Sequence, residues 1–423
     1  MPQLLPERFR PLFSATVIVS ALGYFVDIYD LLLFSIVRVP SLQALGLKGQ
    51  RLLDDGILLL DVQMIGLLLG GILWGVLGDK RGRRSVLFGS ILLYSVANFA
   101  NAFIIELAAL LPGGVTPFQL YVVLRFLAGI GLAGELGAAV TLVSESLPKD
   151  LRGYGTAIVA GVGVSGAVVA ATVGKYFSWQ VAYMTGGILG FLLLATRATL
   201  LESRMFQALE AQEVSRGDFF ALFTNGDRFR RFFCSILIGV PLWFAIGILI
   251  TLSPELSREL GIPGITAGES IKYAYAGLVV GDLASGLLSQ YFRSRRRVVF
   301  AFQTLTLLLT FVYVGSRGAS PTYFYGLCFC IGIAAGYWAV FITIAAEQFG
   351  TNLRATVATS APNFVRASVV PLTLVLQWLT HHTALGLLYS ALAVGIGCTL
   401  LAYLALALLE ESHGKALDFV EAT

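Results

Sequence analysis

A short charged stretch between two long apolar runs sets the limits on what this chain can fold into. Residues 75–84 read Gly-Val-Leu-Gly-Asp-Lys-Arg-Gly-Arg-Arg and carry five charges, whereas the flanking runs, about 57–78 and 85–105, carry almost none. Charged side chains are too costly to hold in hydrocarbon, so this stretch is predicted to form a tight loop at a membrane surface. Four of the five charges are positive, which is typical of a cytoplasmic loop.

The composition points to a helical membrane protein. Only 13% of the 423 residues are charged and 57% are hydrophobic, whereas soluble domains average about 25% charged residues. A bilayer-spanning helix needs about 20 apolar residues. Twelve segments meet that length: 12–37, 57–78, 85–106, 118–145, 153–176, 180–201, 231–253, 270–292, 298–315, 321–346, 355–379 and 384–409.

The distribution of Lys and Arg gives a topology. With the 75–84 loop inside, twelve spans place both termini in the cytoplasm of a multi-pass protein of the cell (inner) membrane. Of the 29 Lys and Arg residues, 20 then lie on the cytoplasmic side and six on the outer side. This asymmetry is the one expected for a correctly oriented membrane protein. The remaining three, Arg38, Arg125 and Arg366, fall within spans or at their edges.

The chain repeats itself, which indicates two related halves. Residues 145–152 (Glu-Ser-Leu-Pro-Lys-Asp-Leu-Arg) match residues 347–354 (Glu-Gln-Phe-Gly-Thr-Asn-Leu-Arg) at an offset of 202 residues. A duplicated six-helix unit explains this pattern. The predicted fold is an all-α membrane protein of twelve transmembrane helices in two pseudo-symmetric six-helix bundles. Its parts are an N-terminal bundle (1–201), a cytoplasmic central loop (202–230), a C-terminal bundle (231–409) and a cytoplasmic tail (410–423).

Several motifs resemble those of one transporter family. The 75–84 loop fits G-x-L-[AG]-D-[RK]-x-G-R-[RK], which closely resembles the loop between helices 2 and 3 of major facilitator superfamily transporters. Residues 23–30 and 125–135 are similar to the G-x-x-x-[ED]-x-Y-D and R-x-x-x-G-x-G-x-x-G-E patterns of metabolite–proton symporters, and residues 411–417 resemble the tail of sugar porters. The resemblance implies two bundles around a central cavity that work by alternating access.

Four ionisable residues in the first half are candidates for proton coupling. Asp27 and Asp30 are three residues apart and share a helix face. A rise of 1.5 Å per residue puts them about 22 and 27 Å along their span, at a depth similar to that of Arg125. Proximity to Arg125 favours a charged carboxylate and separation favours a protonated one. A static ion pair and direct substrate binding are the alternatives. Glu135 is either a second protonatable site or a buried, hydrogen-bonded carboxylate.

The second half offers candidates for substrate binding. Arg366 is predicted near the middle of its span, where a guanidinium suits a carboxylate ligand by bidentate pairing. The alternative is an ion pair between Arg366 and Asp282. Aromatic residues on spans either wall a cavity or pack among helices and at the membrane interface. The remaining candidates are Asn363, Tyr24, Tyr29, Trp243, Tyr337 and Trp338.

Charged residues at the predicted cytoplasmic ends of helices are candidates for gating. Acidic and basic groups recur there in both halves, so they could form an ionic latch whose individual pairs are weak. The alternative is a solvated positively charged cluster without a gating role. The charged residues concerned are Asp79, Arg83, Glu145, Arg152, Glu347 and Arg354, and the glycines of the 75–84 loop, Gly78 and Gly82, are included with them.

The sequence disfavours an enzyme. It has no G-x-x-x-x-G-K-[ST] loop for a nucleotide and no His/Cys cluster for a metal, so we expect no catalytic residue, metal or cofactor. The predicted function is proton-coupled uptake of a small organic acid by a monomer, with an organic anion, H⁺ and the lipid bilayer as partners and no nucleic acid. A sugar or polyol symporter, an uncoupled facilitator, a proton-driven exporter and a transporter-like sensor remain alternatives.

Overall fold

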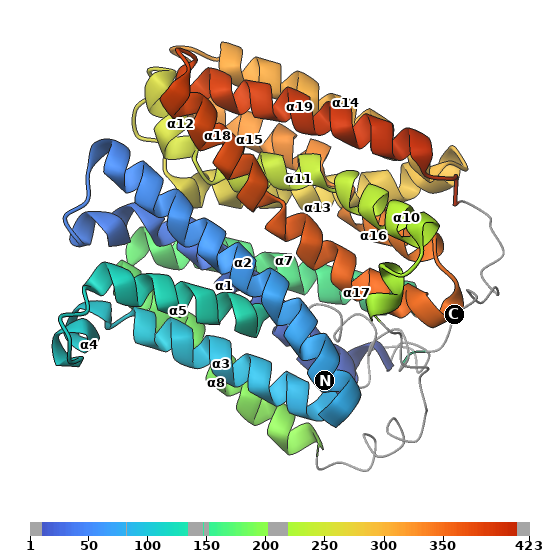
Figure 1. Ribbon diagram of the computed structural model, residues 1–423, viewed down its shortest axis with the longest axis horizontal. Helices are drawn as coiled ribbons and strands as arrows, with labels where there is room; N and C mark the ends of the chain where they lie inside the picture. Colours follow the sequence, from blue (N-terminus) through green and yellow to red (C-terminus); the bar gives the residue numbers. More distant parts are fainter. Residues whose placement is uncertain (1–10, 82, 134–146, 148–151, 202–218, 413–423) are drawn as a thin grey trace, which may run out of the picture. The chain divides into compact units, whose positions relative to one another are not determined.

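The computed structural model describes residues 11–81, 83–133, 147, 152–201 and 219–412 of the chain, and these are helices joined by short connections. Helices occupy all twelve predicted segments. In the first half they are α1 (Ala15–Ala44), α2 (Gly49–Arg81), α3 (Arg83–Asn101), α4 (Ile104–Leu110), α5 (Pro117–Leu132), α7 (Arg152–Tyr176) and α8 (Trp179–Leu201). Figure 1 shows their arrangement in blue and green.

The second half contains more, shorter elements, because several predicted spans are broken. They are η2 (Phe219–Leu222), α10 (Gly226–Leu237), α11 (Val240–Phe244), the π-helix η3 (Ala245–Ile250), α12 (Ser253–Glu259), α13 (Ala267–Tyr291), α14 (Arg295–Gly315), α15 (Pro321–Ala335), α16 (Trp338–Glu347), α17 (Thr351–Ala367), α18 (Val369–His382) and α19 (Gly386–Leu408). Within the described residues, seven helices are long and apolar enough to cross a membrane, and the bent pair α3–α4 adds an eighth.

The chain divides into two compact units that do not follow its order. Unit 1 comprises Met1–Val37 and Leu69–Val214, and unit 2 comprises Arg38–Leu68 and Ser215–Thr423. The boundary therefore passes through α1 and α2. The ends of these two helices that meet at the turn around Lys48 pack with the C-terminal half of the chain.

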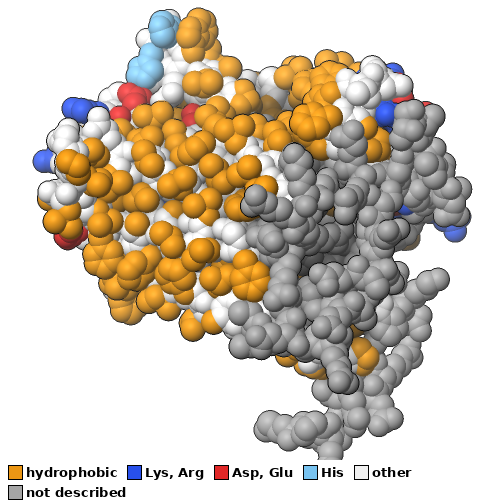
Figure 2. All heavy atoms as spheres, turned by 60° about the horizontal axis from the view of Figure 1, so that its bottom comes forward, with side chains coloured by type: hydrophobic (Ala, Val, Ile, Leu, Met, Phe, Trp, Pro, Cys, Tyr) orange, Lys and Arg blue, Asp and Glu red, His pale blue; other side chains and the backbone are white. Residues whose placement is uncertain are grey.

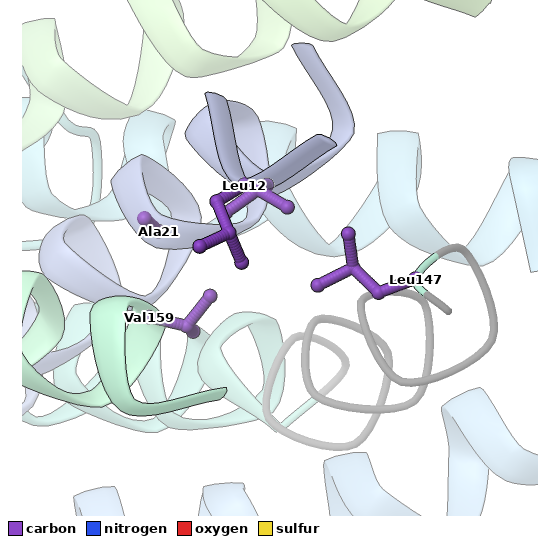
Figure 3. Packing of buried hydrophobic residues seen from close by; sticks show 5 residues of the cluster. Leu12, Ala21, Leu147 and Val159 are labelled. Atoms are coloured by element: carbon purple, nitrogen blue, oxygen red, sulfur yellow. The ribbon is translucent and has the colours of Figure 1, made fainter. Parts of the chain in front are cut away.

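A small apolar cluster ties together elements of unit 1. Leu12, just before α1, and Val17 and Ala21, in the first turns of α1, pack with Val159 of α7 and with Leu147, and all five are buried. Figure 3 shows Leu12, Ala21, Val159 and Leu147 converging from separate segments. Burial of each such side chain stabilises the unit by about 1.5–3 kcal/mol at most, with the small Ala contributing less.

Prolines explain three of the breaks in unit 2. A proline in a helix cannot donate to the carbonyl four residues earlier, and its ring clashes with that carbonyl. Pro241, Pro254 and Pro371 stand four residues after the last residues of α10, η3 and α17 respectively. Figure 1 shows α17 and α18 as successive segments on either side of such a break.

The break between α15 and α16 has no proline and lies where two helices pack closely. A Cβ atom on Gly277 or Gly281 of α13, or on Gly332 or Gly336 at the end of α15, would stand 1.9–2.5 Å from an atom of the facing helix backbone. Small residues allow helices to approach this closely inside a membrane. α15 ends where Gly336 meets α13, and the chain resumes as α16 at Trp338.

The two halves share a helix start that supports the predicted duplication. Thr116 caps α5 by accepting a hydrogen bond from the backbone N–H of Gln119, and Ser320 caps α15 in the same way from Tyr323. Each cap is followed directly by a proline, which suits the first turn of a helix.

The surface is apolar to a degree that fits a multi-pass membrane protein. Figure 2 shows a face dominated by hydrophobic side chains, with charged ones toward its margin. Large exposed side chains include Leu283, Leu287 and Leu404. Soluble monomers rarely expose apolar patches this extensive, so these faces are suited to lipid.

Candidate functional site

Unit 1 holds the two aspartates of α1 in a dry environment. Asp27 and Asp30 are 1% and 0% exposed. Between them, the Tyr29 hydroxyl donates a 3.0 Å hydrogen bond to the Ala182 carbonyl of α8, and this fixes the rotation of α1 against that helix. Asp30 lies within electrostatic reach of Asp27 and Arg125. An isolated buried carboxylate is costly, so Asp30 requires either protonation or a partner.

Arg125 on α5 is fully buried, but neither aspartate is its ion-pair partner. Its Nη2 donates to Oδ1 of Asn98 on α3, and its guanidinium lies 4.8 Å from the centre of the Tyr183 ring. The Tyr183 hydroxyl is in turn 2.6 Å from that of Tyr121. Among the described residues, the guanidinium of Arg125 thus contacts Asn98 and Tyr183 and forms no ion pair with Asp30.

We predict that Gly186→Ala perturbs the aspartate site. A Cβ atom at Gly186 would stand 2.3 Å from Oδ1 of Asp30 and 3.2 Å from Cε1 of Tyr29, so α8 or the carboxylate must move. We expect slower uptake and a loss of about 1–3 kcal/mol of stability, measurable by thermal unfolding of the purified protein. Gly161→Ala on α7 is the control, because nothing lies within 4 Å of its Cβ position. Equal effects of both substitutions would contradict the prediction.

Unit 2 places the second group of candidates around the break between α15 and α16. The carboxylate of Asp282, on α13, accepts a 3.3 Å hydrogen bond from the backbone N–H of Ala339 in the first turn of α16. An anion at a helix N-terminus is favourably placed. Asp282 forms no ion pair with Arg366 in the described structure. Each of the two residues therefore makes its own contacts with other groups.

Arg366 on α17 is the most unusual side chain of this group. It is 2% exposed, and its guanidinium carbon lies 5.9 Å from the ring centres of both Trp243 and Trp338. Its Nε and Nη1 atoms have no hydrogen-bond acceptor within the described chain, and the same holds for the donor Nε1 of Trp243. Asn363, one turn earlier on the same helix face, has an unpartnered Oδ1. These groups can together receive a carboxylate.

The other aromatic candidates have packing roles that are visible in the structure. The ring of Tyr24 fills the space over Gly163 of α7, where a Cβ would stand 1.8 Å from it. Tyr337 is fully buried, and its hydroxyl donates a 3.1 Å hydrogen bond to the Ile238 carbonyl at the end of α10. Tyr29 and Tyr337 thus each brace one helix against another by a bond to a carbonyl.

Two of the candidate gating residues, Glu347 and Arg354, have contacts within the described residues. Glu347 pairs with Arg295 at the start of α14, and Arg354 donates a 3.2 Å hydrogen bond to the Phe349 carbonyl. The described part of the chain therefore joins Glu347 to a residue that the sequence did not suggest. Glu135, Glu145, Gly82 and the side chains at Gly78, Asp79, Arg83 and Arg152 lie outside the described residues.

The structure adds polar contacts in unit 2 that the sequence did not predict. Nη2 of Arg38, near the end of α1, lies 2.7 Å from a carboxylate oxygen of Glu255 on α12, with both side chains buried. The carboxyl of Asp61 on α2 lies within hydrogen-bond distance, 2.7 Å, of the Thr373 hydroxyl of α18. Each is a charged residue inside an apolar run, which is the signal that could have identified it, but neither partner could be inferred from spacing.

A family model described as the Major Facilitator Superfamily matches residues 21–374. Three relatives align over most of their length. A Bacillus subtilis protein, named provisionally as the niacin/nicotinamide transporter NiaP, is 24% identical over 89% of this chain and 92% of its own. The sialic acid transporter NanX of Escherichia coli is 25% identical (83% and 82%), and the benzoate transport protein of Acinetobacter baylyi is 22% identical (84% and 79%).

The fold also matches a solved structure. A crystal structure of a D-xylose–proton symporter superposes with a TM-score of 0.69, covering 95% of this chain and 99% of that one at 17% sequence identity. Identity this low speaks to the fold alone. With the all-helical architecture of the described residues, it confirms the fold class predicted from the sequence.

Proposed function

The chain belongs to the Major Facilitator Superfamily, and from that premise we propose that it is a proton-coupled symporter of small carboxylates, aromatic ones above all. As a member of a transporter family it is a multi-pass membrane protein and not an enzyme. The proposal gives substrate recognition to unit 2 and proton binding to unit 1, and it places both termini in the cytoplasm of the cell membrane in accordance with the Lys and Arg distribution.

The observation that carries the substrate proposal is the buried guanidinium of Arg366, whose Nε and Nη1 have no hydrogen-bond acceptor among the described residues. A charged group that has lost its hydration needs a counter-charge, and a carboxylate can accept two parallel N–H bonds from an arginine. The indoles of Trp243 and Trp338 lie beside the guanidinium, so a flat ring attached to the carboxylate would meet aromatic faces. Niacin and benzoate, named for two of the relatives, are such ligands, and sialic acid also carries a carboxylate.

The observation that supports proton coupling is the burial of Asp30 near Arg125 without an ion pair. A carboxylate in this position exchanges between a protonated state, when it is dry and separate, and a charged state, when water or the guanidinium reaches it. Asn98 holds Arg125, which keeps the cation close but not bound to the acid. Alternating access would then load the proton on one side of the membrane and release it on the other.

Uptake by proteoliposomes tests the proposed function. Benzoate, nicotinate and D-xylose are offered with and without an inside-alkaline pH gradient. We expect the initial rate of uptake of the two carboxylates to exceed that of protein-free liposomes, into which the neutral acids diffuse, and this protein-dependent rate to rise with the pH gradient and fall when a protonophore is added. Uptake that only equilibrates would indicate a facilitator, and uptake of the sugar alone would reject the carboxylate.

We predict that Asp30→Asn uncouples transport from the pH gradient. The amide fills the same buried space but cannot exchange a proton, so gradient-driven accumulation should be lost while counterflow exchange of the carboxylate continues. Asp55→Asn is the control, because Asp55 lies near the start of α2 and pairs with the exposed Arg51. Undiminished accumulation in Asp30→Asn would remove this residue from the coupling mechanism.

A further inference from the structure

Asp61 is a buried carboxylate that the proposed mechanism does not use. It lies a third of the way along α2, is 6% exposed, and belongs to unit 2. Its oxygens lie 2.7 and 2.9 Å from the Oγ1 of Thr373 on α18. Thr373 is fully buried, so neither group can turn to water. This contact joins α2 to α18 through buried polar atoms, in addition to the exposed contact between Asp54 and His381.

A count of hydrogens at this contact favours a protonated Asp61. The Thr373 hydroxyl also lies 2.9 Å from the Val369 carbonyl and 2.8 Å from the Val370 carbonyl. One hydroxyl proton thus faces four acceptor oxygens, two of them on Asp61. If Asp61 carries a proton, the carboxyl O–H donates to Thr373, and Thr373 donates to a carbonyl of its own helix. Two of the four short oxygen–oxygen contacts then contain a hydrogen, whereas an ionised Asp61 would leave only one that does.

No cation among the residues that the structure describes offers a charged Asp61 an alternative partner. Within the described chain, Thr373 is the one residue that forms a hydrogen bond or an electrostatic interaction with Asp61. The nearest titratable groups on the two helices are Asp54 and Asp55 on α2 and His381 and His382 on α18, six to nine positions away or about 9–14 Å. Asp54 contacts His381.

The other charged side chains of the neighbouring elements either pair with another residue or lie far from Asp61. Arg38 of α1 and Glu255 of α12 pair with each other. Arg366 of α17 lies among tryptophans seven residues before Thr373. Isolated buried charge is costly, so an ionised Asp61 would destabilise the contact that a protonated Asp61 makes.

We propose that Asp61 is a second proton-binding site, separate from Asp30, and that its bound proton holds α2 against α18. Loss of this proton to water leaves a carboxylate that must be hydrated, and the two helices then part at this point. The state in which α2 and α18 are in contact binds one proton more than the state in which they are apart. The population of the state in contact therefore falls as the pH rises. The inference rests on the proposed transport function for its purpose, but not on proton binding at Asp30.

Spin–spin distances in the full-length protein, reconstituted in nanodiscs, test this proposal. Spin-labelled non-canonical amino acids replace Lys48, in the turn between α1 and α2, and Ala384, between α18 and α19, which are both exposed. The native cysteines then stay in place. At low pH we expect a population of molecules with a short distance between the labels. As the pH rises, the ratio of this population to the long-distance population should fall by up to tenfold per pH unit, because one proton is linked to the change.

Matched variants identify the residue responsible. Asp61→Asn should keep the short distance at every pH, because the amide donates to Thr373 without a removable proton. Thr373→Val should lower the short-distance population even at low pH, and Thr373→Ser should restore it. Asp30→Asn should leave the pH dependence intact, whether or not Asp30 couples transport. A wild-type distribution that ignores pH, a pH dependence that survives in Asp61→Asn, or one that disappears in Asp30→Asn would overturn the proposal.

Discussion

Arg366→Ala is expected to weaken carboxylate binding by roughly 30- to 1,000-fold, which corresponds to about 2–4 kcal/mol. The guanidinium has two nitrogen atoms without an acceptor and is almost fully buried between Trp243 and Trp338, so a bound carboxylate would supply its missing counter-charge. Isothermal titration of the purified protein with benzoate or nicotinate measures the loss. Arg366→Lys should recover only part of it, because a single ammonium cannot reproduce the two parallel bonds.

The stability of the protein without substrate separates a binding role from a packing role. A buried guanidinium without a full set of acceptors costs free energy, so Arg366→Ala should unfold at the same temperature as the wild type or higher in the absence of substrate. In this variant, addition of substrate should no longer raise the unfolding temperature. Arg317→Ala, at an exposed loop position, should change neither quantity. A large loss of stability with unchanged affinity would show that Arg366 is a packing residue.

The apolar runs alone were enough to predict the architecture. Each run contains a helix because backbone groups in hydrocarbon can be satisfied only within the segment itself, and this holds whatever the tertiary contacts are. The bend of the third span is different, since α3 and α4 meet at 89°. Nothing in the apolar pattern of residues 85–106 indicates that angle.

Helix breaks were predictable where a proline causes them and not elsewhere. Pro371 marks the division of the eleventh span, Pro241 divides the seventh, and Pro254 follows its end, each by the same loss of a donor. Pro40 and Pro362, in contrast, lie inside unbroken helices. The break at Gly336 has no proline, and the close contact with α13 at that residue is a property of the fold and not of the local sequence.

The candidate residues were recognisable as charges within spans, but their partners were not. Depth along a helix brought Arg125 to the level of Asp30, yet the residue that Arg125 contacts is Asn98, whose amide carries no signal in an apolar run. Likewise, Asp61 and Thr373 are 312 positions apart. Rotation of each helix about its axis decides such pairs, and hydrophobic periodicity is weak in segments that are apolar on every face.

Glu255→Gln is expected to destabilise the conformation described here by about 3–5 kcal/mol, because it leaves the guanidinium of Arg38 buried without a counter-charge. Arg38 is 0% exposed and Glu255 8%. The same Arg38 nitrogen also donates a 3.3 Å hydrogen bond to the Thr251 carbonyl. The packing around Arg38 leaves little room for adjustment, since a Cβ on Gly56 would stand 2.8 Å from its Nη1. Thermal unfolding and the distance between labels at Lys48 and Ala384 report the loss.

A double substitution shows whether the charge itself matters. Arg38→Met with Glu255→Leu replaces the pair by apolar groups of similar volume, which is often neutral or stabilising when a buried pair is exchanged. We expect this variant to regain the stability that Glu255→Gln loses and to keep the short label distance, but to transport slowly, because an apolar contact gains nothing from hydration when the ends of α1 and α12 part. Normal transport by the double variant would show that the Arg38–Glu255 pair only stabilises the fold and takes no part in the cycle.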